Sequence, residues 1–317
     1  MLKISVIIPV YNAASFLRKA VESALQFEEV QEILLVEDGS TDHSLAVCEI
    51  LESEYDRVHL FQHPNKANRG AGASRNLGLE KASQEFIAFL DADDHYLSNR
   101  FEAEKELFKN EKIEGVFGAI DTEFLSEKGK KEFEEKFKNI SLTTVNYAGE
   151  GKEIFEGLLG LTPKTFGTFF HLNALTIRAS SLEKNKLRFN EQLRVHQDSD
   201  FIIKLAYHCF LKTGSIEKAV AVRGVHDDNR ITKIKLYSEL YNERQHHLWK
   251  SLHIWAKEKN IGKKYAEHFR LRKISYEIST KKGSQKYLLL LSEILRNPKI
   301  LKTRYRFTYL KLSKHTT

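Results

Sequence analysis

Short apolar runs alternate with amphipathic segments along the first 100 residues. Four of the runs are brief and almost wholly apolar, which is typical of buried strands. They cover residues 4–10, 33–36, 58–61 and 86–90. Between them, apolar residues recur at helical spacing over 16–25, 45–51 and 73–79. Strands that alternate with helices predict an α/β fold with a mostly parallel sheet and right-handed crossovers.

The pattern is less regular beyond residue 100. Residues 114–124 and 173–178 favour strands, and the charge-dense stretch 128–138 favours a solvated helix or loop. Asp198 begins a further helical pattern, and the chain beyond His226 is helical to its end.

Charge is distributed unevenly between the two parts of the chain. Residues 231–317 contain 21 Lys and Arg side chains against 6 Glu, a net charge of +15, whereas the remainder has a net charge of −8. An acidic body followed by a basic tail indicates an anionic partner and a boundary near residue 230.

Composition excludes several classes of protein. The chain has 317 residues and is 41% hydrophobic, which is enough for a packed core and argues against global disorder. Its two cysteines, Cys48 and Cys209, do not form a disulfide framework or a zinc site, and we expect buried thiols. We see no signal-peptide pattern and no apolar run near the roughly 20 residues that span a bilayer. We therefore expect a cytoplasmic protein.

Three acids, Asp91, Asp93 and Asp94, follow the apolar run of residues 86–90 directly. They are expected at the carboxyl edge of the sheet, where open α/β sheets bind ligands. Like charges this close repel, and a hard cation such as Mg²⁺ or Mn²⁺ would offset them. The alternative is a solvated acidic turn that caps the next helix.

The loops after the other three early strands also contain groups suited to a nucleotide. Tyr11 offers a ring for stacking on a base, and Asp38 offers an acceptor for the N3–H of uracil. Arg75 follows a glycine-rich loop and offers a cation to the nucleotide or its phosphates. Taken singly, each has a plainer reading as a rim aromatic, a turn former or a surface ion-pair partner.

These four segments, in this order, resemble the family 2 glycosyltransferases of GT-A fold. The matching motifs are SVIIPVYN (5–12), VEDGSTD (36–42), GAGASRN (70–76) and LDADD (90–94). The resemblance is strong over residues 3–100 and continues more weakly to about residue 230. The weaker part runs through residues 176–178, 189–191 and 198–201.

The resemblance implies an inverting, metal-dependent transferase that uses a nucleotide-sugar. It implies a GT-A-type, Rossmann-like, mostly parallel sheet flanked by helices. We expect residues 1–230 to form this domain, with a nucleotide-binding half at 1–100 and an acceptor-side half at 101–230. Residues 231–317 would form a basic helical C-terminal extension.

Residue roles follow from the resemblance alone. Pro9, Tyr11 and Asp38 would hold the base, and Arg75 would help to place the nucleotide. Asp91 would lie at the ribose or at metal-bound water.

The metal would be Mn²⁺ or Mg²⁺, held mainly by Asp93 with Asp94 in support. His226 resembles a late histidine that reaches the metal or the diphosphate in related enzymes. The catalytic base would be Asp198, where Gln197 replaces the glutamate that commonly precedes it. The plainer reading of Asp198 is a helix N-cap.

The donor is predicted to be a UDP-sugar, and the acceptor a glycan or lipid-linked hydroxyl in surface-polysaccharide or cell-wall synthesis. The sugar, the linkage and the oligomeric state stay open. The alternatives are a non-catalytic nucleotide-sugar-binding subunit and a nucleic-acid-binding protein that uses its basic tail. No nucleic-acid-binding motif accompanies that charge, so no nucleic acid is expected. A nucleotidyltransferase is disfavoured because no phosphate-cradling lysine loop is recognisable.

The basic tail also predicts a surface contact. Residues 287–295 and 305–312 combine leucine and aromatic faces with nearby lysines and arginines. Basic amphipathic helices lie on anionic membranes, so we expect peripheral association with the inner face of the cell membrane. The alternative is that these helices pack on the transferase domain with a solvated basic face.

Overall fold

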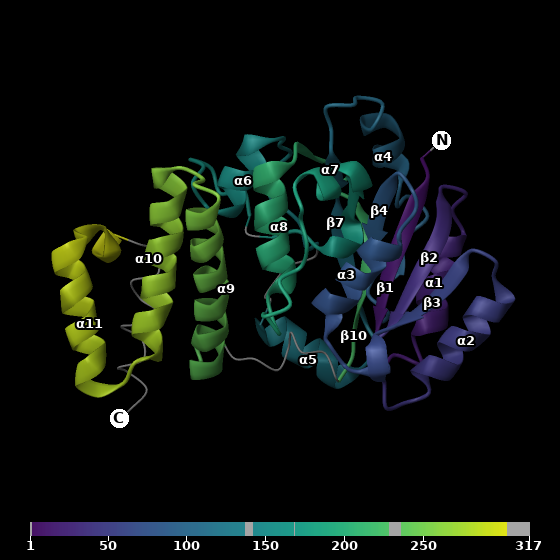
Figure 1. Cartoon of the computed structure of the whole chain (residues 1–317), viewed down its shortest axis with the longest axis horizontal. Coiled ribbons are helices and arrows are strands. Elements are labelled where there is room, and N and C mark those ends of the chain that lie inside the picture. Colours follow the sequence, from purple (N-terminus) through teal and green to yellow (C-terminus); the bar gives the residue numbers. More distant parts are fainter. Residues whose placement is uncertain (1, 137–141, 168, 228–235, 303–317) are drawn as a thin grey trace. The chain divides into compact units, whose positions relative to one another are not determined.

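The computed structural model describes residues 2–136, 142–167, 169–227 and 236–302 (Figure 1). The chain divides into two compact units. The first comprises Met1–Arg194 and Phe201–Asp228, and the second comprises Val195–Asp200 and Asn229–Thr317.

A seven-stranded sheet forms the centre of the first unit, with strand order β3-β2-β1-β4-β8-β6-β9. Its strands are β1 (Ile4–Val10), β2 (Val30–Glu37), β3 (Val58–Gln62), β4 (Phe86–Phe89), β6 (Gly115–Phe117), β8 (Leu175–Arg178) and β9 (Leu211–Thr213). β1 pairs in parallel with both β2 and β4, and β2 pairs in parallel with β3. β8 runs antiparallel to β4 and β6. The expected mostly parallel sheet is confirmed.

Successive side chains of β1 point to opposite faces of the sheet and contact different helices there. On one face, Val6 and Ile8 join a core that includes residues of α1 (Leu17–Leu25) and α2 (Ser44–Glu54). On the other, Ile7 meets Gly78 of α3 (Ala71–Lys81). A Cβ at Gly78 would lie 2.4 Å from Ile7 Cγ2, so glycine permits this close approach of helix and sheet.

A second, three-stranded sheet lies in the same unit, with β10 (Ala219–Val225) between β5 (His95–Tyr96) and β7 (Ala119–Phe124). β10 passes so close to the acidic loop that a Cβ at Gly224 would lie 2.5 Å from the Asp93 carbonyl oxygen. This approach brings the end of β10 to the carboxylates that follow β4.

The predicted strand region at 114–124 is thus two strands, β6 and β7, and the charge-dense stretch forms α5 (Glu127–Lys136). The other elements of the first unit are short. They are the 3-10 turns η1 (Pro64–Lys66) and η2 (Leu172–Ala174) and the helices α4 (Glu102–Leu107), α6 (Lys152–Leu158) and α7 (Ala179–Lys184). α8 (Gln197–His208) begins in the second unit and continues in the first. Cys48 and Cys209 are buried free thiols.

The described part of the second unit is helical. It contains α9 (Glu239–Glu258), α10 (Lys263–Thr280), α11 (Gly283–Arg296) and the 3-10 turn η3 (Pro298–Lys302). Ser238 caps α9 by accepting a hydrogen bond from the Tyr241 amide. Ile274 and Ile278 of α10 and Ile300 form a small core against which Leu289, Leu290 and Ile294 of α11 pack. The predicted amphipathic stretch at 305–312 lies outside the described residues.

Within the described residues, no helix is long and apolar enough to cross a membrane.

Candidate active site

Asp38 directly follows β2 and is buried, at 2% exposure. Its Oδ1 accepts from the Arg69 amide at 2.6 Å and its Oδ2 from the Gly70 amide at 2.8 Å. Asp38 therefore shapes the glycine-rich loop before α3. Each carboxylate oxygen has a second lone pair and could accept one more hydrogen bond. The predicted bond from a uracil N3–H to Asp38 is therefore compatible with this geometry, and it stays a prediction.

Tyr11 follows β1 and is 46% exposed, with its ring available for stacking. Its neighbour Asn12 has a positive φ of 51°. Asn12 Oδ1 accepts from the Thr41 amide at 2.8 Å, which ties the loop after β1 to the loop after β2. Pro9 is half-buried within β1. The predicted base-binding roles of Pro9 and Tyr11 stay predictions.

Arg75 lies on α3 and is 7% exposed. Its guanidinium donates to Asp91 Oδ1 at 2.5 Å and lies 5.5 Å from the centre of the Phe189 ring. Arg75 and Asp91 belong to two separate sequence motifs, and the fold joins them in one ion pair, with 9% of the Arg75 side chain and 28% of the Asp91 side chain exposed.

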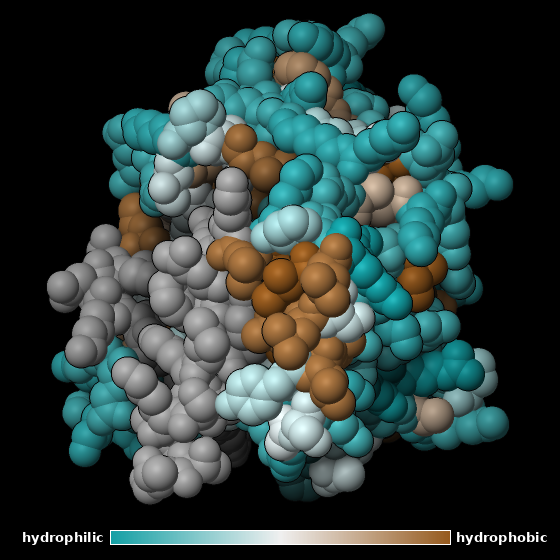
Figure 2. All heavy atoms as spheres, turned by 90° about the vertical axis from the view of Figure 1, so that its left-hand side faces the viewer, coloured by the Kyte–Doolittle hydropathy of each residue, from teal (hydrophilic) through white to brown (hydrophobic). Residues whose placement is uncertain are grey.

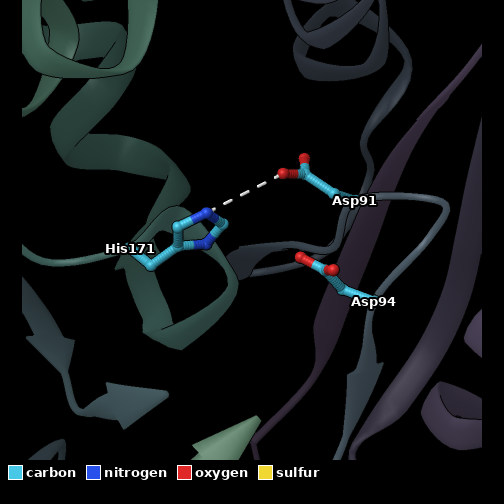
Figure 3. Close-up of side chains that lie close together, drawn as sticks. All are labelled: Asp91, Asp94 and His171. Atoms are coloured by element: carbon cyan, nitrogen blue, oxygen red, sulfur yellow. Dashed lines mark ion pairs between the residues drawn. The ribbon is translucent and has the colours of Figure 1, made fainter. Parts of the chain in front are cut away.

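Asp91, Asp94 and His171 converge at the carboxyl end of β4 (Figure 3). His171 Nε2 lies 4.0 Å from Asp91 Oδ2. Asn173 links the two acids, since its Oδ1 accepts from the Asp91 amide at 3.1 Å and its Nδ2 donates to Asp94 Oδ2. The other Asp94 oxygen accepts from the Gly224 amide at 2.9 Å. The loop after β4 is thus held by η2 and β10.

Burial and charge set the protonation of this cluster. Burial, together with the charges of Asp93 and Asp91, raises the pKa of Asp94 well above its usual range. Burial has the largest single effect on Asp91 and acts to raise its pKa, but the Arg75 guanidinium and the other positive groups nearby, Arg223 among them, together leave that pKa lowered. Burial, helped by the charge of Arg223, lowers the pKa of His171 to about 3. His171 is therefore neutral at physiological pH.

A second pair lies beside this cluster. His226, just beyond β10, has its Nε2 at 3.2 Å from Asp93 Oδ2. The His226 ring stacks on Phe16 with ring centres 4.9 Å apart. Asp93 and His226 are both partly accessible, with 30% of the Asp93 side chain and 21% of the His226 side chain exposed.

The described donor atoms that lie within 4.8 Å of one another are those of Asp91, Asp94 and His171. The holding of a divalent cation by Asp93, Asp94 and His226 stays a prediction. The charges of Asp93 and Asp91 help to raise the pKa of Asp94, and a bound cation would offset this repulsion. Carboxylate with imidazole suits Mn²⁺. His171 fits less well. Its Nδ1 accepts from the Asn173 amide at 3.3 Å, so the neutral ring has its proton on Nε2, the nitrogen that faces Asp91. We therefore interpret His171 as a neutral ring whose Nε2–H faces Asp91 across 4.0 Å, which is beyond hydrogen-bond distance.

Asp198 is the second residue of α8 and so lies within the first helical turn. Its Oδ1 accepts from the Ser199 amide at 2.8 Å. Two nearby residues have structural bonds in the second unit. Ser251 Oγ donates to the fully buried Asp200 at 2.7 Å, and His196 Nε2 lies 3.1 Å from Gln245 Nε2. The role of Asp198 as base stays a prediction.

Sequence analysis missed Asn173 and Arg223 and gave His171 no role. Asn173 is fully buried and Arg223 is 7% exposed, an unusual burial for polar side chains. Arg223 lies three residues before His226 in an otherwise apolar strand. A single cation within an otherwise apolar strand was the sequence signal by which Arg223 could have been recognised.

The fold and this site define a glycosyltransferase of GT-A architecture. Residues 5–173, more than half of the chain, match the family described as glycosyl transferase family 2. The chain belongs to this family, and the resemblance recognised in the sequence is confirmed.

Two named relatives show what similar chains do. The first is the GalNAc(5)-diNAcBac-PP-undecaprenol beta-1,3-glucosyltransferase of Campylobacter jejuni. It is 29% identical over 255 residues, which is 75% of this chain and 79% of that protein. The second is the cholesterol galactosyltransferase of Borreliella burgdorferi. It is 31% identical over 219 residues, which is 68% of this chain and 57% of that protein.

Coverage of other relatives is shorter. A glycosyltransferase of Haemophilus influenzae without an assigned activity is 42% identical over 100 residues. The chain spans only 39%, 20% and 28% of the length of the first three curated relatives it matches.

Among solved structures, residues 1–349 of Staphylococcus aureus TarS in complex with UDP-GlcNAc match with a TM-score of 0.60 and 17% identity. The match covers 99% of this chain and 92% of that one. This likeness confirms the GT-A fold.

Proposed function

We propose that this chain transfers a sugar from a UDP-sugar to a hydroxyl of a glycan or lipid-linked acceptor, with inversion at the anomeric carbon. The observation that supports this most is the meeting of four sequence motifs at the carboxyl ends of β1, β2 and β4. There, Asp38 holds the loop before α3, Arg75 pairs with Asp91, and Asp93 faces His226. Ligands of open α/β sheets bind at this edge.

Donor binding would use the residues of the nucleotide-binding half. Tyr11 would stack on the base, Asp38 would accept from the uracil N3–H, and the Arg75–Asp91 pair would face the ribose. Asp93, Asp94 and His226 would hold Mn²⁺ or Mg²⁺, which when bound neutralises the charge of the departing diphosphate.

Transfer would occur in a single displacement. Asp198 would accept the proton of the acceptor hydroxyl as that oxygen attacks the anomeric carbon. The C1–O bond to the diphosphate breaks as the new glycosidic bond forms, so no covalent sugar–enzyme intermediate is required. Positioning donor and acceptor in line supplies a large part of such catalysis.

The acceptor side of the proposal draws on the named relatives. One is named for an undecaprenol-linked acceptor and the other for a sterol. A lipid-linked acceptor in surface-polysaccharide or cell-wall synthesis fits a protein that works at the inner face of the cell membrane.

A donor screen tests the proposal. Thermal melting with Mn²⁺ and a set of nucleotide-sugars should show stabilisation by UDP-sugars, because a ligand that binds only the folded state raises the melting temperature. Slow release of UDP without acceptor would then separate an enzyme from its rival, a non-catalytic nucleotide-sugar-binding subunit. Stabilisation by no nucleotide-sugar would contradict both.

A further inference from the structure

An apolar face of α11 is exposed in the second unit. Tyr287, Leu288, Leu291 and Leu295 are exposed by 54, 65, 58 and 86%. Figure 2, which faces α11, shows hydrophobic side chains gathered in one patch. We call these four residues the α11 face.

The α11 face lies opposite the packed face of the same helix. At 100° per residue, Leu288, Leu291 and Leu295 group on one side. Leu290 and Glu293 group on the other, where Leu290 packs against the small core of α10 and Glu293 is buried. A surface helix ordinarily has one apolar stripe. α11 therefore has a second stripe that the described residues of its own unit leave exposed.

Cations flank the α11 face. Lys281, Lys282, Arg296 and Lys299 are exposed, whereas Lys286 is buried, and the one acid of residues 281–302 is Glu293. Glu293 is 5% exposed and already pairs with Arg270 at 3.1 Å. Lys281 and Lys282 precede the helix, and Arg296 follows the last leucine. The exposed surface of α11 thus has no free carboxylate to repel an anionic partner.

The flanking ion pairs are weak ones. Lys282 bonds Glu239 with 79% of its side chain exposed, and Lys299 bonds Glu267 with 66% of its side chain exposed. Exposed pairs of this kind contribute little to stability. The two ammonium groups can therefore leave the carboxylates of Glu239 and Glu267 and bind phosphate groups of a partner instead.

We propose that the α11 face inserts into the headgroup region of an anionic phospholipid bilayer, with the flanking lysines and arginines on lipid phosphates. α11 has 14 residues, too few to span a bilayer, so it would lie in the plane of the surface. Charge favours this occupant over a second copy of the chain, because pairing two such faces would bring together two C-terminal regions of +15 each. The choice of the inner leaflet rests on the proposed function, whereas docking to anionic lipid does not.

Vesicle co-sedimentation tests the proposal with the full chain. The wild type should pellet with phosphatidylglycerol-containing vesicles and remain in solution with phosphatidylcholine alone. Leu291→Glu combined with Leu295→Glu should lower the partition coefficient at least tenfold. The matched control is Ile50→Glu combined with Ile254→Glu, which changes the charge equally at residues exposed by 47 and 46%. It should stay within twofold of the wild type.

Two further measurements keep the outcomes distinct. Thermal melting and Mn²⁺-dependent UDP binding of each variant should match the wild type, so loss of folding is detected. UDP binding without vesicle binding would overturn this inference alone, and vesicle binding without UDP binding would overturn the proposed function alone. Unchanged vesicle binding by the α11 variant, or its conversion from dimer to monomer in light scattering, would overturn the membrane assignment.

Discussion

His226 Nε2 lies 3.2 Å from Asp93 Oδ2, although 133 positions separate the two residues in the chain. The pair forms because β10 runs alongside the loop that follows β4, with Gly224 against the Asp93 carbonyl. A carboxylate and an imidazole at this distance are suited to share one divalent cation.

Asp93→Ala should abolish stabilisation of the protein by UDP with Mn²⁺. We expect UDP affinity measured by calorimetry with Mn²⁺ to fall at least about tenfold, since loss of even an outer partner of a metal ligand typically costs 10–100-fold. His226→Ala should weaken binding less. Asp56→Ala, at an exposed carboxylate outside the site, should change nothing. UDP binding by the wild type that is equally tight in EDTA would contradict the metal site.

The uracil-reading role of Asp38 predicts a preference for UDP over CDP. One hydrogen bond to a charged acceptor contributes about 1.5–3 kcal/mol, so the preference should be at least several-fold. Competition binding against a labelled nucleotide would measure it. Equal affinities would leave Asp38 only the observed role of holding the Arg69 and Gly70 amides.

Asn173→Ala should destabilise the loop after β4. It removes the acceptor of the Asp91 amide and the donor to Asp94, and a buried polar group left unpaired costs about 1–3 kcal/mol. Chemical denaturation should show a loss of that size, together with weaker Mn²⁺-dependent UDP binding. Asn146→Ala, which removes an exposed amide bonded to the Thr165 carbonyl, should have a much smaller effect. Equal effects of the two substitutions would exclude a linking role for Asn173.

His171 predicts a dependence of stability on pH. Its pKa is about 3 in the fold, against an ordinary value near 6.5, so only the unfolded chain binds the proton between these values. The contribution of His171 is fully present above pH 6.5 and is lost as the pH falls towards 3, by at most about 1.4 kcal/mol per unit. His171→Gln should lose stability less steeply than the wild type between pH 7 and 5. Parallel pH profiles of the two proteins would show that His171 titrates normally.

Much of the fold was predictable because β1, β2, β3 and β4 are short, mostly apolar runs with polar residues at their ends. The helices between these strands predicted that the strands run parallel. Asp38 and the acidic loop, which follow two of the strands, were therefore expected at the same edge of the sheet. The bond from Asn173 to Asp94 was not predictable, because a single buried asparagine leaves no periodic signal. The Arg75–Asp91 pair depends likewise on how α3 meets β4. Both depend on distances that only the assembled sheet defines.

Proton transfer to Asp198 is the step on which the proposed reaction depends, and the rate of UDP release from a UDP-sugar tests it most directly. In the Asp198→Asn variant, the asparagine has the size of aspartate but cannot take the proton from the acceptor hydroxyl. Transfer should fall by about 10²–10⁴-fold, the usual contribution of a general base, while donor affinity with Mn²⁺ stays within a few-fold. Transfer by Asp198→Asn at the wild-type rate would move the base elsewhere, and absence of UDP release by the wild type with every UDP-sugar would contradict the proposed transferase itself.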